Sequence, residues 1–314
     1  MVVLVPLLAV SAVACVEPSF GSEPGYGEHA SAIVGGSEAL PGEWPDTVAV
    51  LGRKGTCTGT LVAPDVVLTA GHCAGIDPVQ VIADTTDYST DAGVRVHVAH
   101  THVYPSWQTT YDVAVLVLIE PIAGVAPRKI GTSCTFDGFE SNLPVRLVGF
   151  GAIDTMGRAG NTRLREAVTA VLDPDCTGGN GCKDQVAPGG EFVAGGTGDA
   201  DSCFGDSGGP VLLDTAGGPV VIGAVSRGIA NAATPCGAGG IYVRTDKIVA
   251  WIEATAGKPI AKDACDDVAY SSETGLDEDE LAEASVGCSI GSGGSGSAGA
   301  VMIVVLALLR RRRA

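Results

Sequence analysis

The chain has 314 residues, enough for one large two-part domain or two small ones. Glycine occupies 45 positions and aromatic residues make up only 5%, so strands joined by tight turns are favoured over a helical bundle, in which each glycine costs about 1 kcal/mol. The formal net charge of −17 excludes nucleic acid as a partner, because phosphate binding requires clustered Lys and Arg.

Residues 1–15 are expected to direct export. The run 2–14 is apolar and of signal-peptide length, too short to span a bilayer permanently. Cys15 directly follows Ala14, as at a bacterial lipoprotein cleavage site, and a plain signal peptide with an incidental cysteine remains the alternative. The polar segment 16–32, which contains Gly and Pro, is interpreted as a pro-segment.

Between residues 33 and 258, short apolar and β-branched runs alternate with Gly, Pro and Asp turns. Thr47–Leu51 and Val220–Ala224 are two examples. Runs of this length and density predict an all-β domain, either a barrel or a sandwich. One α-helix is predicted near the end of this segment, with Thr245 as its N-cap and Gly257 close to its last turn.

Two further segments follow the β-rich region. Residues 259–297 are acidic and then rich in Gly and Ser, and they predict a disordered stalk. Residues 298–314 form an apolar run that ends in Arg310–Arg313. The order Cys288, Gly/Ser spacer, apolar run and arginines resembles the MYXO-CTERM type of bacterial sorting tail, which implies processing near Cys288 and anchoring to the cell envelope. A plain tail anchor is the alternative.

Three short motifs supply the residues of a nucleophilic site. His72 ends the sequence LTAGH, Asp112 begins DVAVLVL, and Ser207 lies within GDSGGP. A serine hydroxyl attacks well only when an imidazole takes its proton, and the imidazole needs a buried carboxylate to hold its tautomer. The backbone N–H groups of Gly205 and Ser207 are candidates for stabilising the developing oxyanion.

Together with the IVGG sequence at Ile33–Gly36, these motifs make residues 33–258 resemble a chymotrypsin-fold, trypsin-like serine protease. The resemblance implies two antiparallel six-stranded β-barrels, divided near residue 140, with a C-terminal α-helix. No cofactor and no metal are assigned, because the acids between Asp77 and Asp91 fit a solvated loop at least as well as a set of calcium ligands. The implied activity is hydrolysis of peptide bonds in protein or peptide substrates through an acyl-enzyme intermediate.

The resemblance also assigns a specificity pocket. Asp201 falls at the position of the pocket floor, where a carboxylate selects a substrate Arg or Lys; Asp199 is a shifted alternative. The remaining pocket positions are Ser202, Ser226, Gly228 and Gly240.

The family has tryptophan in many members where this chain has Arg227. The arginine removes an apolar shelf beside the substrate, which favours acidic or small residues next to the cleaved one.

Activation is implied by the same resemblance. A new N-terminus at Ile33 would fold inward and pair its ammonium group with Asp206. The preceding residue is Ala32, so an enzyme specific for Arg and Lys would not cut this bond and a separate activating protease is required. From the predicted leader and the sorting tail, the mature enzyme is expected to be secreted or at the cell surface, anchored to the bacterial outer envelope.

Cysteine pairings follow from the resemblance in part. Cys57–Cys73 and Cys203–Cys236 are pairs typical of the family. Cys176–Cys182 is suggested by its short loop, and Cys134–Cys265 is the pair left once Cys15 and Cys288 are set aside.

Two other classes of function stay open at this stage. One is a protease-fold binding protein without activity, and the other is an esterase that uses the same three residues.

Overall fold

The computed structural model describes residues 33–177, 179–196 and 200–264. The predicted leader, pro-segment and sorting tail, with Cys15, Cys288 and Arg310–Arg313, lie outside the described residues. Among the helices that the structure describes, none is long and apolar enough to cross a membrane.

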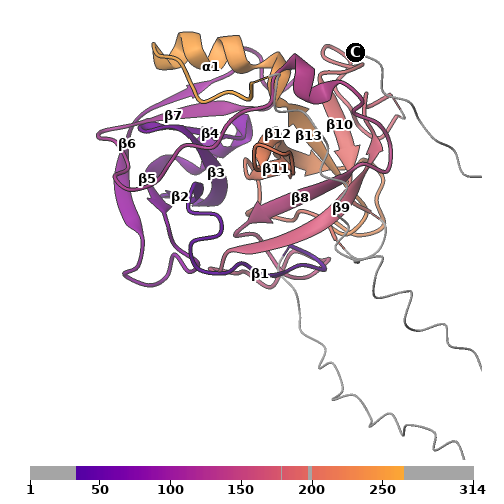
Figure 1. The fold of residues 1–314 in the computed structure, drawn as a ribbon. Helices are drawn as coiled ribbons and strands as arrows, with labels where there is room; N and C mark the ends of the chain where they lie inside the picture. Colours follow the sequence, from indigo (N-terminus) through magenta and orange to yellow (C-terminus); the bar gives the residue numbers. More distant parts are fainter. Residues whose placement is uncertain (1–32, 178, 197–199, 265–314) are drawn as a thin grey trace, which may run out of the picture. The chain divides into compact units, whose positions relative to one another are not determined.

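The first half of the described chain forms a closed antiparallel barrel with the strand order β2-β3-β4-β7-β6-β5, drawn in indigo to purple in Figure 1. Its strands are rich in Val, Leu and Thr, which favour the pleated conformation. Their bounds are Thr47–Gly52 (β2), Gly55–Ala63 (β3), Val66–Thr69 (β4), Pro78–Ala83 (β5), Val94–Val103 (β6) and Ala114–Leu118 (β7).

The second half forms another closed ring of six antiparallel strands in the order β8-β9-β10-β13-β12-β11, because β8 pairs with both β11 and β9. A short strand, β1 (Ser37–Glu38), adds to the edge of β9. The ring consists of Pro144–Gly149 (β8), Arg165–Asp173 (β9), Glu191–Ala194 (β10), Pro210–Leu213 (β11), Val220–Gly228 (β12) and Gly240–Arg244 (β13). The predicted pair of six-stranded barrels is confirmed.

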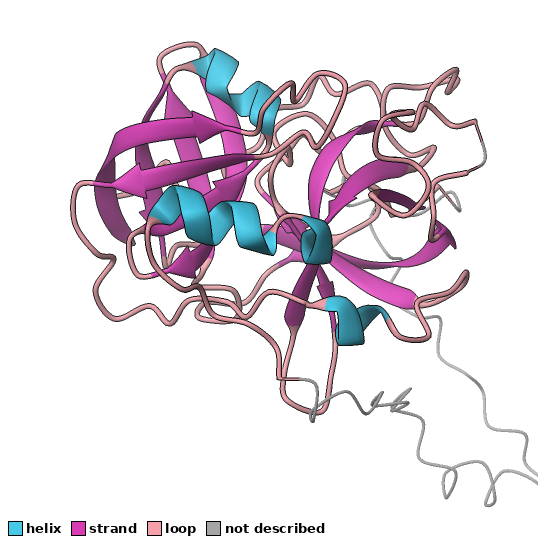
Figure 2. Cartoon of the chain, turned by 90° about the horizontal axis from the view of Figure 1, so that it is seen from above, coloured by secondary structure: helices cyan, strands magenta, loops and turns pink. Residues whose placement is uncertain are grey.

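The predicted C-terminal helix is also confirmed, but it begins later than expected. Thr245–Lys247 forms a 3-10 turn (η3), and the α-helix α1 spans Val249–Ala256. Thr245 is not its N-cap, because its hydroxyl donates to the carbonyl oxygen of Val221 at 2.9 Å instead. The helix ends as predicted at Gly257, whose left-handed conformation (φ 66°) suits a residue without a Cβ atom. Figure 2 shows α1 together with the shorter helical turns η1 (Gly71–Ile76) and η2 (Ser133–Phe136).

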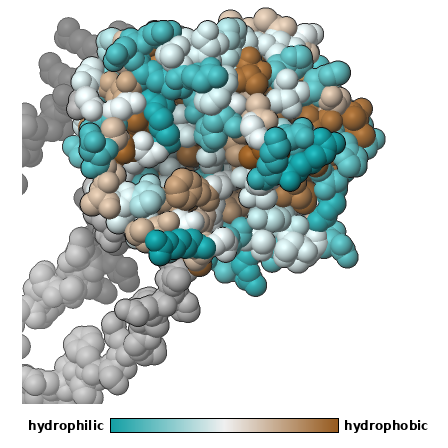
Figure 3. Space-filling view, turned by 180° about the vertical axis from the view of Figure 1, so that it is seen from behind, coloured by the Kyte–Doolittle hydropathy of each residue, from teal (hydrophilic) through white to brown (hydrophobic). Residues whose placement is uncertain are grey.

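Each barrel has its own apolar interior, and two further clusters join the barrels. One of them packs Val66 and Val115 of the first barrel against Ala224 and Val243 of the second and against Ile252 of α1. The joint between the barrels is therefore itself a hydrophobic core, which holds the two halves in one relative position. On the face of the molecule seen in Figure 3, by contrast, hydrophobic side chains are scattered among hydrophilic ones.

The packed domain extends beyond the expected boundary at residue 258. Ile260 and Asp263 are buried, and the N–H of Asp263 donates to the carbonyl oxygen of Ile130. The carbonyl oxygen of Val62 accepts from Ala261. The assignment of residues 259–264 to a disordered stalk was therefore wrong, because these backbone groups find partners in the loop after the first barrel and on β3.

Candidate active site

His72 lies in the turn η1, directly after β4, and is held by the carboxylate of Asp112. The backbone N–H of His72 donates to Asp112 Oδ1 at 2.9 Å, and His72 Nδ1 lies 2.9 Å from Asp112 Oδ2. The preceding residue is Gly71, where a Cβ atom would lie 3.0 Å from Asp112 Oδ1. Its missing side chain lets the carboxylate approach both the backbone and the ring of the histidine.

Asp112 is buried in the loop before β7, and a third group donates to it. Ser226 Oγ, on β12 of the second barrel, lies 2.7 Å from Asp112 Oδ2. Burial acts to raise the pKa of Asp112, but hydrogen bonds from His72 and Ser226 outweigh it and hold the pKa below its usual value. The carboxylate therefore stays ionised beside the imidazole.

Ser207 lies in the turn before β11 and is attached to the first barrel through its backbone. Its carbonyl oxygen accepts from the N–H of Thr58 on β3 at 2.9 Å. The next residue, Gly208, has φ 80°, and a Cβ atom there would lie 2.1 Å from Thr69 Oγ1 and 2.4 Å from Ala70 N. Only glycine permits this close approach, which brings the turn carrying Ser207 next to the end of the strand that leads to His72.

His72, Asp112 and Ser207 all line one cavity of about 660 Å³. Among the described contacts, no hydrogen bond joins Ser207 to the His72 ring. Gly205 has φ 103°, and no described group accepts a hydrogen bond from the N–H of Gly205 or of Ser207. The cavity therefore brings together the three predicted catalytic residues. The two predicted backbone donors, at Gly205 and Ser207, lie in the same turn and have no acceptor among the described residues.

The predicted pocket floor, Asp201, is 1% exposed. Its Oδ2 accepts from the N–H groups of Gly237 and Gly239 at 2.8 and 3.0 Å, whereas Oδ1 has no hydrogen-bond partner within the described residues. Burial raises the pKa of Asp201, and hydrogen bonding from Gly239 and Gly237, with smaller effects of Ser202 and Tyr242, opposes that rise only in part. A buried carboxylate oxygen without a donor is a costly group that a cationic ligand would satisfy.

The other predicted pocket positions differ in whether they line the cavity. Ser202, Ser226 and Gly228 line the cavity, whereas Asp201 and Gly240 do not. A Cβ atom at Gly240 would lie 2.6 Å from the hydroxyl oxygen of Tyr242 and 3.0 Å from Ser202 Oγ, so this glycine leaves room for neighbouring polar groups. The alternative floor residue Asp199 lies outside the described residues.

The predicted activation residues are both buried. Ile33 is 1% exposed and packs in the interior of the second barrel. The carboxylate of Asp206 accepts from the N–H groups of Gly151 and Cys203, each at 2.8 Å. Burial raises the pKa of Asp206 to about 7, and the nearby charge of Asp201 adds to this effect. No cation pairs with Asp206 among the described residues.

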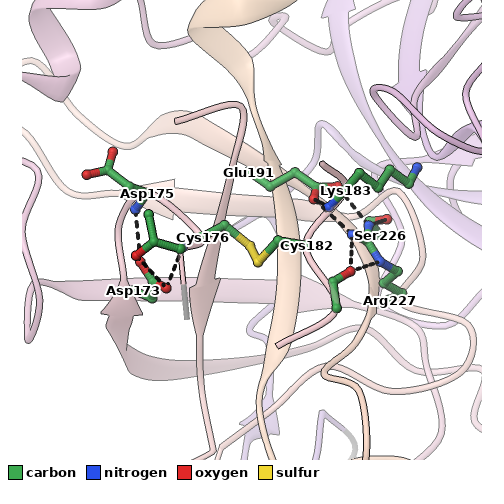
Figure 4. Close-up of a disulfide and its surroundings, with 10 residues drawn as sticks. Asp173, Asp175, Cys176, Cys182, Lys183, Glu191, Ser226 and Arg227 are labelled. Atoms are coloured by element: carbon green, nitrogen blue, oxygen red, sulfur yellow. Dashed lines mark hydrogen bonds and ion pairs between the residues drawn. A yellow bond between two sulfur atoms is a disulfide. The ribbon is translucent and has the colours of Figure 1, made fainter. Parts of the chain in front are cut away.

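Arg227 lines the cavity, but its guanidinium is already paired within the protein. Its guanidinium forms a two-pronged ion pair with Glu191 of β10, with distances of 2.7 and 2.8 Å, as Figure 4 shows. The charge is therefore already neutralised, which weakens the expected preference for acidic substrate residues. Sequence analysis did not single out Glu191, and the one signal for it was an acidic residue at the start of an otherwise apolar strand.

Three predicted disulfides are confirmed: Cys57–Cys73, Cys176–Cys182 and Cys203–Cys236. Cys134 is also disulfide-bonded, and its predicted partner Cys265 lies outside the described residues. Cys57, Cys73 and His72 lie close enough together to suggest a metal site, but the two sulfur atoms are bonded to each other and are not free thiolates.

Comparison with protein families gives a match over most of the described chain. The model described as "Trypsin" matches residues 33–252. A trypsin of Saccharopolyspora erythraea is 31% identical over 221 residues, which cover 68% of this chain and 92% of that protein. Human chymotrypsin-like elastase family member 3B is 28% identical over 272 residues, which cover 79% of this chain and 98% of that protein.

A solved structure shows the same architecture. The secreted serine protease VesC from Vibrio cholerae matches with a TM-score of 0.57 and 27% identity, over 70% of this chain and 48% of that one. This chain thus spans about half the length of the VesC chain.

Proposed function

Because this chain belongs to the Trypsin family of serine-type endopeptidases, we propose that it hydrolyses peptide bonds with Ser207 as nucleophile, His72 as general base and Asp112 as the group that orients the histidine. Support comes mainly from one arrangement. Asp112 holds both the backbone and the ring of His72, and all three residues line one cavity.

In the proposed reaction, His72 takes the hydroxyl proton as Ser207 Oγ attacks the substrate carbonyl carbon. Asp112 holds the proton-bearing Nδ1, so Nε2 is the nitrogen left to accept. The N–H groups of Gly205 and Ser207 donate to the developing oxyanion, and the loss of one such donor typically costs about 3–4 kcal/mol of transition-state stabilisation. His72 then returns the proton to the leaving amine, and water releases the acyl group by the same steps.

We propose that cleavage follows Arg or Lys. The unpartnered oxygen of the buried Asp201 supports this specificity, because a guanidinium or ammonium group would supply the missing donor. The elastases among the relatives raise small uncharged residues as the competing specificity.

We further propose that the enzyme is exported as a precursor and activated by another protease at Ala32–Ile33. The disulfides are typical of an oxidising compartment. Within the described part of the chain no cation pairs with the buried Asp206, and a new Ile33 ammonium group would provide one. Anchoring through the C-terminal tail, and through a lipid on Cys15 until the pro-segment is removed, completes this proposal.

Labelling with a serine-directed organophosphonate tests the catalytic assignment. Purified enzyme cut before Ile33 should be labelled at Ser207, and the Ser207→Ala variant should be neither labelled nor active, with turnover reduced by several orders of magnitude. Amidase activity within about tenfold of wild type in Ser207→Ala would contradict the proposal. A labelled enzyme that hydrolyses simple esters but no peptide would favour the esterase alternative.

Substrate libraries test the specificity. Wild-type enzyme should prefer Arg and Lys over Ala and Val, and Asp201→Ser should lose most of this preference while keeping its labelling by the organophosphonate. A wild-type preference for small residues would instead support an elastase-like specificity.

Incubation of the precursor tests activation. The precursor alone should stay inactive, whereas a protease specific for small residues should expose Ile33 and start activity. Sequencing of both ends of the mature protein, together with its mass, determines which anchor is retained. Activity that arises in the precursor alone, with Ile33 newly exposed, would contradict the requirement for a second protease.

A further inference from the structure

We propose that the ion pair of Arg227 and Glu191 is a positioning device for catalysis, which orients the Ser226 hydroxyl toward Asp112 and so holds the His72–Asp112 pair in its working geometry. The inference rests on the proposed function, since it assigns a role in turnover to residues that do not themselves react.

A β-bulge places Ser226 where it can reach Asp112. Along β12, Val225 pairs with Tyr242 and Arg227 pairs with Ile241, so Ser226 is the extra residue between them. A bulge re-aims the side chain of the extra residue, and such bulges occur often next to active sites. Here the side chain crosses to the first barrel and ends 2.7 Å from Asp112 Oδ2.

Arg227 determines which way the Ser226 proton points. Its Nη1 lies 3.0 Å from Ser226 Oγ, and a guanidinium group can only donate. Ser226 Oγ therefore accepts from Arg227, and its own proton goes to Asp112 Oδ2. With this orientation the hydroxyl stabilises the carboxylate that holds His72.

Arg227 is in turn held by acceptors on both sides, as Figure 4 shows for its ion pair. Glu191 is 0% exposed and binds the guanidinium through both oxygens. Gly181 adds its carbonyl oxygen, 2.8 Å from Nη2, and belongs to the loop closed by Cys176–Cys182. Glu191 also accepts from the backbone N–H of Lys183, so strand, loop and arginine form one connected unit.

The charges of Arg227 and Glu191 should affect the pH dependence of activity, because both lie near Asp112 and His72. His72 faces Asp112 from η1, and Lys183 and the Arg227–Glu191 pair approach from the second barrel. Arg227 is the member of its pair that contacts Ser226, so its positive charge is closer to the base than the negative charge of Glu191. A cation near the base disfavours the protonated imidazole, which is the inactive form.

The main test is a set of variants measured in the activated enzyme: Arg227→Met, Glu191→Gln, the double variant Glu191→Met/Arg227→Met, and Ser226→Ala. Active sites are counted by organophosphonate titration, so that kcat refers to competent enzyme. The matched control is Arg128→Met, which breaks the ion pair with the buried Asp46 in another part of the fold. The control should lose thermal stability and keep kcat.

The double variant separates positioning from simple stability. It removes both buried charges, so its melting temperature should recover relative to Arg227→Met, while kcat should stay about tenfold to a hundredfold below wild type and KM should change less than threefold. Combining it with Ser226→Ala should lower kcat no further, because both changes act through one hydroxyl. Recovery of kcat together with the melting temperature, or additive losses with Ser226→Ala, would overturn the inference.

Glu191→Gln carries the test if the double variant does not fold. Glu191→Gln leaves the positive charge of Arg227 uncompensated, so the acid limb of the profile of kcat/KM against pH should move to lower pH by roughly half a unit or more. Arg227→Met leaves the negative charge of Glu191 uncompensated and should move the acid limb to higher pH. Unchanged or parallel shifts would refute the inference. A wild-type enzyme that is not labelled at Ser207 would instead refute the proposed function, which keeps the two failures distinct.

Discussion

The buried carboxyl group of Asp206 should make the uncut precursor less stable as the pH rises. The change to test is Asp206→Asn, made in a precursor that also carries Ser207→Ala so that the cut form used for comparison does not digest itself. In the folded precursor, burial raises the pKa of this group from 3.8 to about 7. The asparagine keeps a similar size but has no proton to lose in this range.

The sign and size follow from linkage. Below pH 3.8 the carboxyl group is protonated in both states and has no effect on the pH dependence. Between pH 3.8 and about 7 it ionises only in the unfolded chain, so stability falls with rising pH, and above that range the loss is complete. A shift of about three units corresponds to about 4 kcal/mol.

Urea unfolding at a series of pH values from 4 to 8.5 measures this effect. The unfolding midpoint of the precursor should fall by more than about 1 M relative to Asp206→Asn across the range. In the chain cut before Ile33, the new ammonium group should remove most of the difference. Parallel curves for the precursor and Asp206→Asn would refute this account of the buried carboxyl group.

Two other variants test the packing that supports the site. Phe192→Ala should lower the free energy of unfolding by about 3–5 kcal/mol, because this side chain is fully buried in the second barrel. Calorimetry in the Ser207→Ala background measures the loss, and a loss below about 1 kcal/mol would contradict the assigned packing. Gly208→Ala should nearly abolish labelling of Ser207 in chains that still fold, since the new methyl group would collide with Thr69 and Ala70 and displace the turn; normal labelling would show that the turn tolerates a side chain.

The fold could be predicted because its signals are local. The β-branched runs and turn residues between 33 and 258 indicate strands but leave a barrel and a sandwich equally open. The pair of barrels was implied only by the resemblance of the short motifs to a known family. The start of the helix was placed wrongly, because Thr245 donates to Val221 on a distant strand rather than to the helix backbone. A sequence window contains the favourable capping residue but not the competing acceptor.

The residues proposed to react could be singled out for a similar reason, since His72, Asp112 and Ser207 each lie in a motif with chemical meaning. The ion pair behind them could not. Glu191 and Arg227 are 36 residues apart and come from strands β10 and β12, which do not pair with each other directly. Their relation depends on the closure of the second barrel and on a bulge at Ser226, and neither has a local pattern.

The close approach of Gly208 to Thr69 and Ala70 makes the position of Ser207 depend on how the two barrels pack against each other. Ser207 belongs to one barrel by sequence, but its carbonyl oxygen and the next residue rest on the backbone of the other. Mechanical force or denaturant that opens the joint would misalign the proposed catalytic residues while both barrels keep their strands. Loss of activity should therefore precede global unfolding, and a partly opened enzyme would be inactive before it is unfolded enough for other proteases to degrade it.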